Sequence, residues 1–305
     1  MEPFRDAPDA GLAWRMLATA VLVALVYAAA VLPAFLAGPV WGAVAAAVAV
    51  AIAVVSVRAA DRLALYAMDA RPVASDEEPE LHAVLDRLCM SSGLPKPRLA
   101  VSALDMPNAF AAGSGPGSAV VCVTDGLRAR LEPAELAAVL AHETAHVANR
   151  DVLVGAIAAF PGLCAGLFLG WWTGLITGRD RYGAGRVAAA MAGGVVLLPL
   201  GAAAAVLHGV GTLVGLALSR HRELCADSTG ALLTGRPTDL ASALGKISDG
   251  LRDASPHDLR ALRPVSALCV VGVSGGVDGL LSGHPTLERR RERLSAISWR
   301  LTGGG

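Results

Sequence analysis

The stretch Ala141-His142-Glu143-Thr144-Ala145-His146 lies near the middle of the 305-residue chain, and the prediction of the fold starts from it. In a helix, residues i and i+4 lie on one face, so both imidazoles can reach one metal ion. The preceding Glu132-Pro133-Ala134-Glu135 is typical of a helix start, with proline in the first turn and acids near the positive end of the helix dipole. The sequence therefore predicts a helix that carries both histidines on its later turns.

The residue after the first histidine indicates the chemistry. A catalytic zinc keeps three protein ligands and one position for water, whose pKa it lowers towards about 7. Glu143 is placed to take the proton when such a water attacks a carbonyl. Two surface histidines on a helix are the alternative, so the motif needs a third ligand before it predicts a metal site.

A second segment offers that ligand. Residues 219–227 read SRHRELCAD and place Glu223 and Asp227 four residues apart on another predicted helix. Glu223 would complete the site, and Asp227 is placed to accept a hydrogen bond from the free ring nitrogen of a ligating histidine, which fixes its tautomer. His221 is a further possible ligand, but it points about 200° away from Glu223. An exposed, charged helix start is the alternative for this segment.

Four stretches resemble the HtpX-type membrane zinc metalloproteases, gluzincins related to the CAAX prenyl endopeptidases. Residues 142–151 (HETAHVANRD) resemble the zinc helix of that family, and residues 219–227 resemble the helix of its glutamate ligand. Residues 107–113 (PNAFAAG) resemble a strand on the substrate side, and residues 284–290 (HPTLERR) resemble a C-terminal motif. The four stretches follow one another in the order expected for the family.

The resemblance implies a zinc endopeptidase with one zinc per chain, bound by His142, His146 and Glu223, with Glu143 as the general base. It also implies a role in the stress response, with membrane proteins, misfolded or damaged ones included, as substrates. His284 would stabilise the oxyanion that forms when water attacks the peptide carbonyl. Without the resemblance, His284 would be an ordinary loop histidine.

Arg289 or Arg290 is predicted to hold an acidic group near this motif. Helices are predicted over residues 77–92, 238–251 and 287–300. A small sheet or hairpin is predicted from the apolar runs 98–102, 108–112 and 119–124, which are separated by glycine-rich segments.

The run 108–112 is predicted to bind substrate. If it is an edge strand, a peptide can add to it through backbone hydrogen bonds. Asn108, Ala109 and Phe110 are the residues expected to contact the peptide. A strand that is buried by its own neighbours is the alternative.

Composition indicates a membrane protein independently of the motif. Hydrophobic residues make up 54% of the chain and charged residues 17%. Uncharged stretches at residues 16–57, broken at Gly38-Pro39, 152–178 and 187–219 meet or approach the roughly 20 residues that a bilayer crossing needs. The predicted fold is a mainly α membrane protein, with four transmembrane helices in two hairpins and a gluzincin-like α+β zinc metallopeptidase unit that contains a small sheet. A signal peptide is a weak alternative for the first span.

Four parts follow from this prediction. Residues 1–58 form the first transmembrane hairpin, 59–151 the first half of the catalytic unit with the HExxH helix, 152–218 the second hairpin, and 219–305 the second half with the glutamate ligand. Because His146 and Glu223 must meet at one metal, the residues between them cross the membrane twice or not at all. The short spacing from each ligand to the adjacent apolar stretch puts the metal about 6 to 9 Å from the apolar boundary.

The protein is predicted to be a multi-pass protein of the inner or plasma membrane. Charges around the first hairpin predict that its catalytic unit faces the cytoplasm. The arginines on that side are Arg5, Arg15, Arg58, Arg62 and Arg71. The loop of the second hairpin contains Arg179, Arg181 and Arg186, which favour the opposite orientation or a hairpin that does not fully cross.

Net charge, the lack of a phosphate-binding motif and the spacing of the cysteines exclude several classes of partner and site. A net charge of zero and the absence of a glycine-rich phosphate loop argue against nucleic acid and nucleotide, which leaves the lipid bilayer and membrane-protein or peptide substrates. The five cysteines show no paired ligand spacing, so a disulfide framework or a thiolate zinc site is not expected. A membrane protein that binds zinc without hydrolysis, as a sensor or scaffold, is the competing function. Glu143 favours hydrolysis, because a binding site alone has no need of it.

Overall fold

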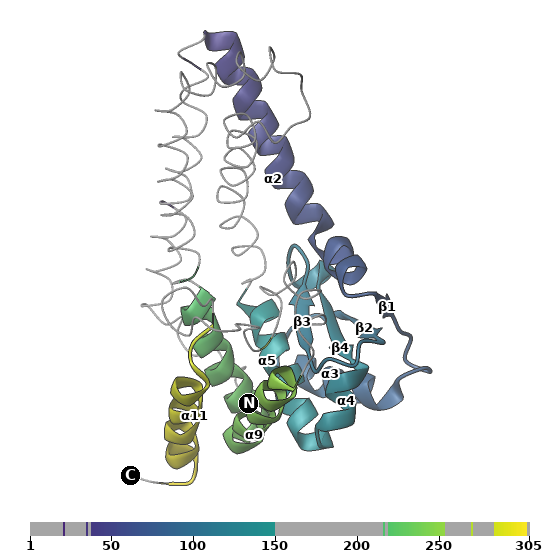
Figure 1. Cartoon of the computed structure of the whole chain (residues 1–305), viewed down its shortest axis with the longest axis vertical. Coiled ribbons are helices and arrows are strands. Elements are labelled where there is room, and N and C mark those ends of the chain that lie inside the picture. The colour runs from purple at the N-terminus through teal and green to yellow at the C-terminus, as the bar shows by residue number, and fades with distance from the viewer. Residues whose placement is uncertain are drawn as a thin grey trace, which may run out of the picture. The chain divides into compact units, whose positions relative to one another are not determined.

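The computed structural model describes residues 38–149, 219–253 and 284–303, together with positions 21, 35, 216 and 270. Described residues from 55 onwards belong to one compact unit, and residues 38–54 belong to a second. The first unit contains helices and a small mixed sheet (Figure 1). The α+β part of the predicted fold is therefore confirmed, whereas the division into four parts stays a prediction.

Helix α2, Pro39–Ala67, contains the second of the four predicted spans. It begins after Gly38, whose φ of 133° is accessible to glycine, and Pro39 occupies its first turn. No helix among the described residues is long and apolar enough to cross a membrane. Apart from single positions, the other three predicted spans lie outside the described residues.

The sheet has the order β1-β2-β4-β3. Its strands are β1 (Ala70–Pro72), β2 (Arg98–Ser102), β3 (Ala109–Ala112) and β4 (Val120–Thr124). β2 and β4 are parallel, and the outer pairs are antiparallel. β3 lies at an edge of the described sheet, yet all four of its residues are buried. Both expectations for this run, an edge position and burial by its neighbours, thus hold together.

The helices of the first unit agree with the sequence predictions, except the short helix over residues 125–130, which was not predicted. They are α3 (Pro79–Ser92), α4 (Asp125–Arg130), α5 (Pro133–Ala148), a helical segment over residues 219–234, α9 (Pro237–Arg252) and α11 (Leu287–Leu301), and a short 3-10 turn, η1, covers Pro116–Ser118. α5 packs against β3, β4, α3 and α9, and α9 packs against α11 (Figure 1). The metal-binding motif is therefore held on a helix at the centre of this unit.

The first turn of α5 is anchored by Glu135. Its Oε2 accepts hydrogen bonds from the Glu132 backbone N–H (2.8 Å) and from Lys246 Nζ (2.7 Å), and its Oε1 accepts one from Ser242 Oγ (2.7 Å). Ser242 and Lys246 belong to α9, so this carboxylate joins the two helices. Completely buried side chains of Leu140 in α5 and Leu244 in α9 add apolar contact area to the core.

Candidate metal centre

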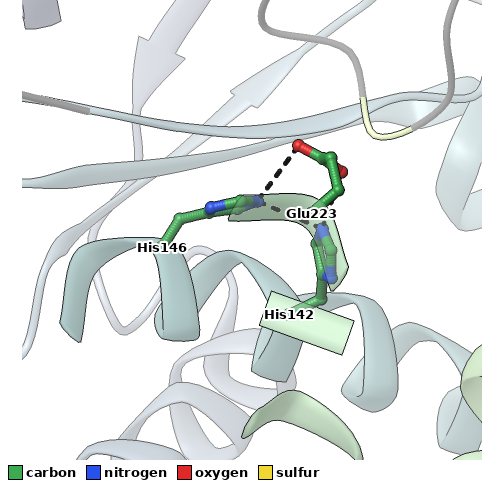
Figure 2. A group of neighbouring side chains, drawn as sticks. All are labelled: His142, His146 and Glu223. Atoms are coloured by element: carbon green, nitrogen blue, oxygen red, sulfur yellow. Dashed lines mark hydrogen bonds and ion pairs between the residues drawn. The ribbon is translucent and has the colours of Figure 1, made fainter. Parts of the chain in front are cut away.

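Three predicted ligands meet in the structure. Figure 2 shows the imidazoles of His142 and His146 on consecutive turns of α5, with the Glu223 carboxylate facing them. One ligand atom from each residue lies within 4.8 Å of the others. The two Nε2 atoms are 3.2 Å apart, and Glu223 Oε2 and Oε1 lie 3.5 Å from Nε2 of His142 and of His146, respectively.

The ligand atoms of this cluster fit a divalent cation. The Nε2 atoms of His142 and His146 and the carboxylate of Glu223 face one point, with one ligand atom of each within 4.8 Å of the others. Glu223 Oε2 is buried, and its polar neighbours among the described residues lie no closer than 3.5 Å: His142 Nε2 and His284 Nδ1 at 3.5 Å and Arg290 Nη1 at 3.7 Å. Two imidazoles and a carboxylate form a donor set of catalytic zinc sites. The residues therefore fit the metal that the sequence predicts.

Asp227 contacts His142 on the side of the ring opposite the other ligands, and Arg290 in turn binds Asp227. Asp227 Oδ1 lies 3.1 Å from His142 Nδ1, within reach of its N–H, which leaves the Nε2 lone pair for the metal side. Arg290 of α11 donates to both oxygens of Asp227, through Nε at 2.8 Å and Nη2 at 2.7 Å. Its Nη1 donates to the carbonyl of Val270 at 2.6 Å. Arg290 is only 2% exposed, so this pair is a buried bidentate ion pair.

Electrostatics in the metal-free site favour a charged network. Burial would lower the pKa of His142, but hydrogen bonds to Asp227 and Glu223 outweigh it and raise this pKa to about 9. Burial would likewise raise the pKa of Glu223, yet nearby His284 and His142 hold it well below its ordinary value. For Asp227, the Arg290 guanidinium overcomes burial and lowers the pKa. The two carboxylates are thus ionised at neutral pH, as metal binding and histidine orientation require.

Glu143 lies in the same turn as the first ligand and is 3% exposed. Burial raises the pKa of its carboxyl above the ordinary value. The charge of Glu143 also adds to the effect of burial on Cys122 of β4, whose thiol pKa rises to about 12. Cys122 does not belong to the metal-binding group found among the described residues.

His284 lies three residues before the start of α11, and its Nδ1 lies 3.5 Å from Glu223 Oε2. The structure thus brings this histidine to the triad, although sequence reasoning without the family resemblance assigned it to an ordinary loop. His221 lies with its Nε2 3.6 Å from the Cys225 sulfur, one turn along the same helix. Neither His221 nor Cys225 belongs to the metal-binding group found among the described residues.

The predicted substrate strand lies in the same unit, and its side chains are buried. Asn108 is 1% exposed, and its Oδ1 accepts a hydrogen bond from the Val270 N–H at 3.1 Å. Ala109 and Phe110 are 0% and 1% exposed, so their side chains belong to the core. Because these figures count backbone and side chain together, a substrate could pair with this part of the strand only after the edge is uncovered.

Sequence reasoning missed the contact of Asn108 and Arg290 with the backbone at Val270, and it left Arg289 and Arg290 as equal candidates for holding an acid. The structure selects Arg290, which is buried, whereas Arg289 is exposed. Helical spacing could have indicated which of the two arginines is buried. Arg290 lies one turn before the apolar Leu294, and both side chains are buried on the same face of α11.

Comparisons with known proteins agree with this geometry. The sequence pattern described as peptidase family M48 matches residues 75–298. The chain belongs to peptidase family M48. Among its M48 relatives, Protease HtpX homolog 1 of Streptomyces coelicolor is 44% identical over 247 residues, which cover 79% of this chain and 78% of that protein. Protease HtpX homolog of Moorella thermoacetica is 40% identical over 300 residues, 95% of either chain.

The resemblance to HtpX-type metalloproteases is thereby confirmed, and this M48 chain is a metalloprotease. A solved structure, that of S. mikatae Ste24p, aligns with a TM-score of 0.48 and 20% identity, covering 92% of this chain and 66% of that chain. The assignment rests on the family match, the relatives and the metal-binding triad, and this distant alignment adds nothing to it.

Proposed function

We propose that this M48 chain is a zinc-dependent endopeptidase that acts at a membrane surface on membrane proteins, misfolded or damaged ones among them. The observation that carries the proposal is the convergence of His142, His146 and Glu223 within 4.8 Å. These residues would hold one zinc per chain. When bound, zinc supplies Lewis-acid chemistry, because it lowers the pKa of water and polarises a carbonyl.

Glu143 is the general base in this proposal. It lies directly after the first ligand, so its carboxylate can accept the proton of the attacking water and later deliver it to the leaving amine nitrogen. Burial raises the pKa of this carboxyl. A carboxylate with a raised pKa is a stronger base, as this role requires.

Asp227 orients His142 through its ring Nδ1, and the buried Arg290 keeps Asp227 ionised for that task. His284, 3.5 Å from Glu223 through its Nδ1, is proposed to donate to the oxyanion that develops on the peptide carbonyl. The motif at 284–290 would thus serve two purposes: its histidine would stabilise the oxyanion, and its arginine would support His142 through Asp227.

A peptide substrate is proposed to lie along β3, the edge strand that packs on α5. Backbone hydrogen bonds to Ala109 and Phe110 would bind it in an extended conformation with little regard to sequence. Asn108 would contribute at the end of this strand. Such sequence tolerance suits an enzyme that removes damaged proteins of many kinds.

The membrane location is supported by the amino-acid sequence. The uncharged stretches at residues 152–178 and 187–219 lie between the two histidine ligands and Glu223. A site so close to apolar segments favours substrates that emerge from the bilayer over free peptides. The arginines beside the first hairpin support a catalytic unit that faces the cytoplasm.

The first test separates hydrolysis from zinc binding. Purified full-length chain in detergent is given a denatured membrane protein, and cleavage is compared among wild type, Glu143→Gln and the exposed control Glu80→Gln. We expect Glu143→Gln to lose activity by about 10² to 10⁴-fold while it keeps one zinc, measured by mass spectrometry. Zinc bound equally in all three chains, with no cleavage by any of them, would instead identify a binding scaffold.

A second comparison tests the substrate class. The same preparations are offered unfolded casein, a soluble substrate, and a denatured membrane protein at equal concentration. Faster cleavage of the membrane protein is expected in lipid nanodiscs, where both molecules share one surface. Equal rates for both substrates in nanodiscs would contradict a preference for membrane proteins and leave the peptidase activity itself intact.

A further inference from the structure

Gly230 lies against the main chain of the first metal ligand. A Cβ atom built on Gly230 would be 2.9 Å from the backbone nitrogen of His142 and 3.0 Å from its Cα. It would also be 3.2 Å from the carbonyl carbon of Ala141. These neighbours are backbone atoms within α5, which cannot move aside without shifting the helix that carries both histidines.

Gly230 shares a helix face with Glu223 and Asp227. At 100° per residue, the three positions fall within about 60° of one another around the helix axis. That face meets His142 at three points: Glu223 Oε2 is 3.5 Å from Nε2, Asp227 Oδ1 is 3.1 Å from Nδ1, and Gly230 abuts the backbone nitrogen. One helix face therefore contacts both the ring and the main chain of one ligand.

The two helices run in opposite directions along this contact. Gly230 lies beside His142, whereas Glu223, earlier in its own helix, reaches His146, which is later in α5. The close backbone contact at Gly230 thus lies about two turns along the helix from the carboxylate that completes the triad. A carboxylate side chain is short, so the separation of the helix axes decides whether it reaches both histidines.

We infer that Gly230 is a positioning residue for the metal centre: its lack of a side chain sets the helix separation at which Glu223 and Asp227 reach the two histidines. The inference rests on the proposed zinc site. Glycine is a poor helix former, so its presence inside residues 219–234 works against helix stability. The close backbone approach accounts for it, because any side chain would push His142 away from the carboxylates.

Another helical glycine provides a matched control. A Cβ on Gly245 of α9 would meet the guanidinium tip of Arg291, an exposed side chain that can swing away. Gly245→Ala therefore makes the same chemical change without displacing any backbone. Leu99→Ala is the second control, because Leu99 is 1% exposed on β2 and its truncation lowers stability away from the helix pair.

The experiment measures zinc affinity of the full-length chain in detergent by competition with a chromophoric chelator. Thermal unfolding of the zinc-free protein is recorded in parallel, and cobalt absorption spectra report on the geometry around the metal. We expect Gly230→Ala to weaken zinc binding at least about tenfold, in the range seen when groups that support metal ligands are changed. Gly230→Ser should weaken it further, and both should change the cobalt spectrum.

The controls decide what the result means. Gly245→Ala and Leu99→Ala should bind zinc as wild type does, although Leu99→Ala unfolds at a lower temperature. Wild-type affinity in Gly230→Ala would overturn the inference, and so would loss of its whole fold while both controls fold, because Gly230 would then serve stability alone. If wild type itself binds no zinc, the proposed metal centre fails first and this inference fails with it.

Discussion

The two ends of α5 bury polar groups in opposite ways. At the first turn, Glu135 is 7% exposed, and both oxygens accept hydrogen bonds from protein groups. At the later turns, His142 and His146 turn their Nε2 atoms towards each other and towards Glu223. Burial is similar at both ends, but only the second brings three possible metal ligands within 4.8 Å of one another. Convergence of ligand atoms, more than burial, therefore marks the metal centre.

An ion pair supports each end, and the two pairs differ in how far they are exposed to water. Lys246 reaches Glu135 at 2.7 Å from a side chain that is 40% exposed. Arg290 binds Asp227 with two hydrogen bonds, and neither side chain is more than 2% exposed. Water can replace the lysine but has little access to the arginine. Removing one partner should consequently cost much more at the metal centre than at the first turn.

The largest effect is expected for Arg290→Met. The substitution leaves the Asp227 carboxylate buried without its cation and the Val270 carbonyl without its donor. Loss of one partner of a buried pair costs about 3 to 5 kcal/mol. Denaturant unfolding of the full chain should show this loss, whereas the exposed control Arg289→Met should stay within about 0.5 kcal/mol of wild type. Equal stability of the two variants would mean that Asp227 is not held by Arg290 in solution.

The sequence predicted site residues that belong to one local motif better than those whose role depends on a contact between distant segments. The α5 motif could be identified because ligand spacing, the proline start and helix-forming residues all lie within one segment. Glu223 and Asp227 followed from spacing on a second helix. The role of Gly230 could not be predicted in this way, because it depends on the tertiary contact of this residue with the backbone of α5.

The same distinction holds for the fold. Runs of apolar residues predicted β2, β3 and β4, because each has enough consecutive residues to show a pattern. The strand β1, Ala70–Pro72, was not predicted: it has only three residues and ends in proline, so its pairing with β2 determines it. Tertiary pairing overrides weak local preference in such short segments.

A pH titration distinguishes the two ends without changing the covalent structure. Burial would lower the pKa of His142, but hydrogen bonds to Asp227 and Glu223 raise it from 6.5 to about 9 in the metal-free site. A raised folded-state pKa adds stability that is complete below pH 6.5 and is lost as pH rises through 9. The pKa of Glu135 is lowered despite some burial, through Lys246 and Ser242, so its contribution changes only in acid.

The unfolding free energy of the zinc-free chain should therefore fall between pH 6.5 and 9.5 by about 1 to 3 kcal/mol, since one pKa unit corresponds to about 1.4 kcal/mol. The zinc-loaded chain should lack this decrease, because a ligating imidazole is already neutral. His142→Gln should lack it as well. A decrease of the same size in that variant would assign the titration to another group.

The smallest effect is expected for Lys246→Met at the first turn. Methionine keeps the apolar stem and removes the ammonium, while Glu135 retains its bonds to Ser242 and to the Glu132 backbone. Because the lysine is 40% exposed, the loss should be below about 1 kcal/mol, and zinc affinity should equal that of wild type. A tenfold change in zinc affinity would show that the first turn adjusts the position of His142 along α5. The two ends of the helix would then be one coupled unit, and the contrast between a structural end and a chemical end would be wrong.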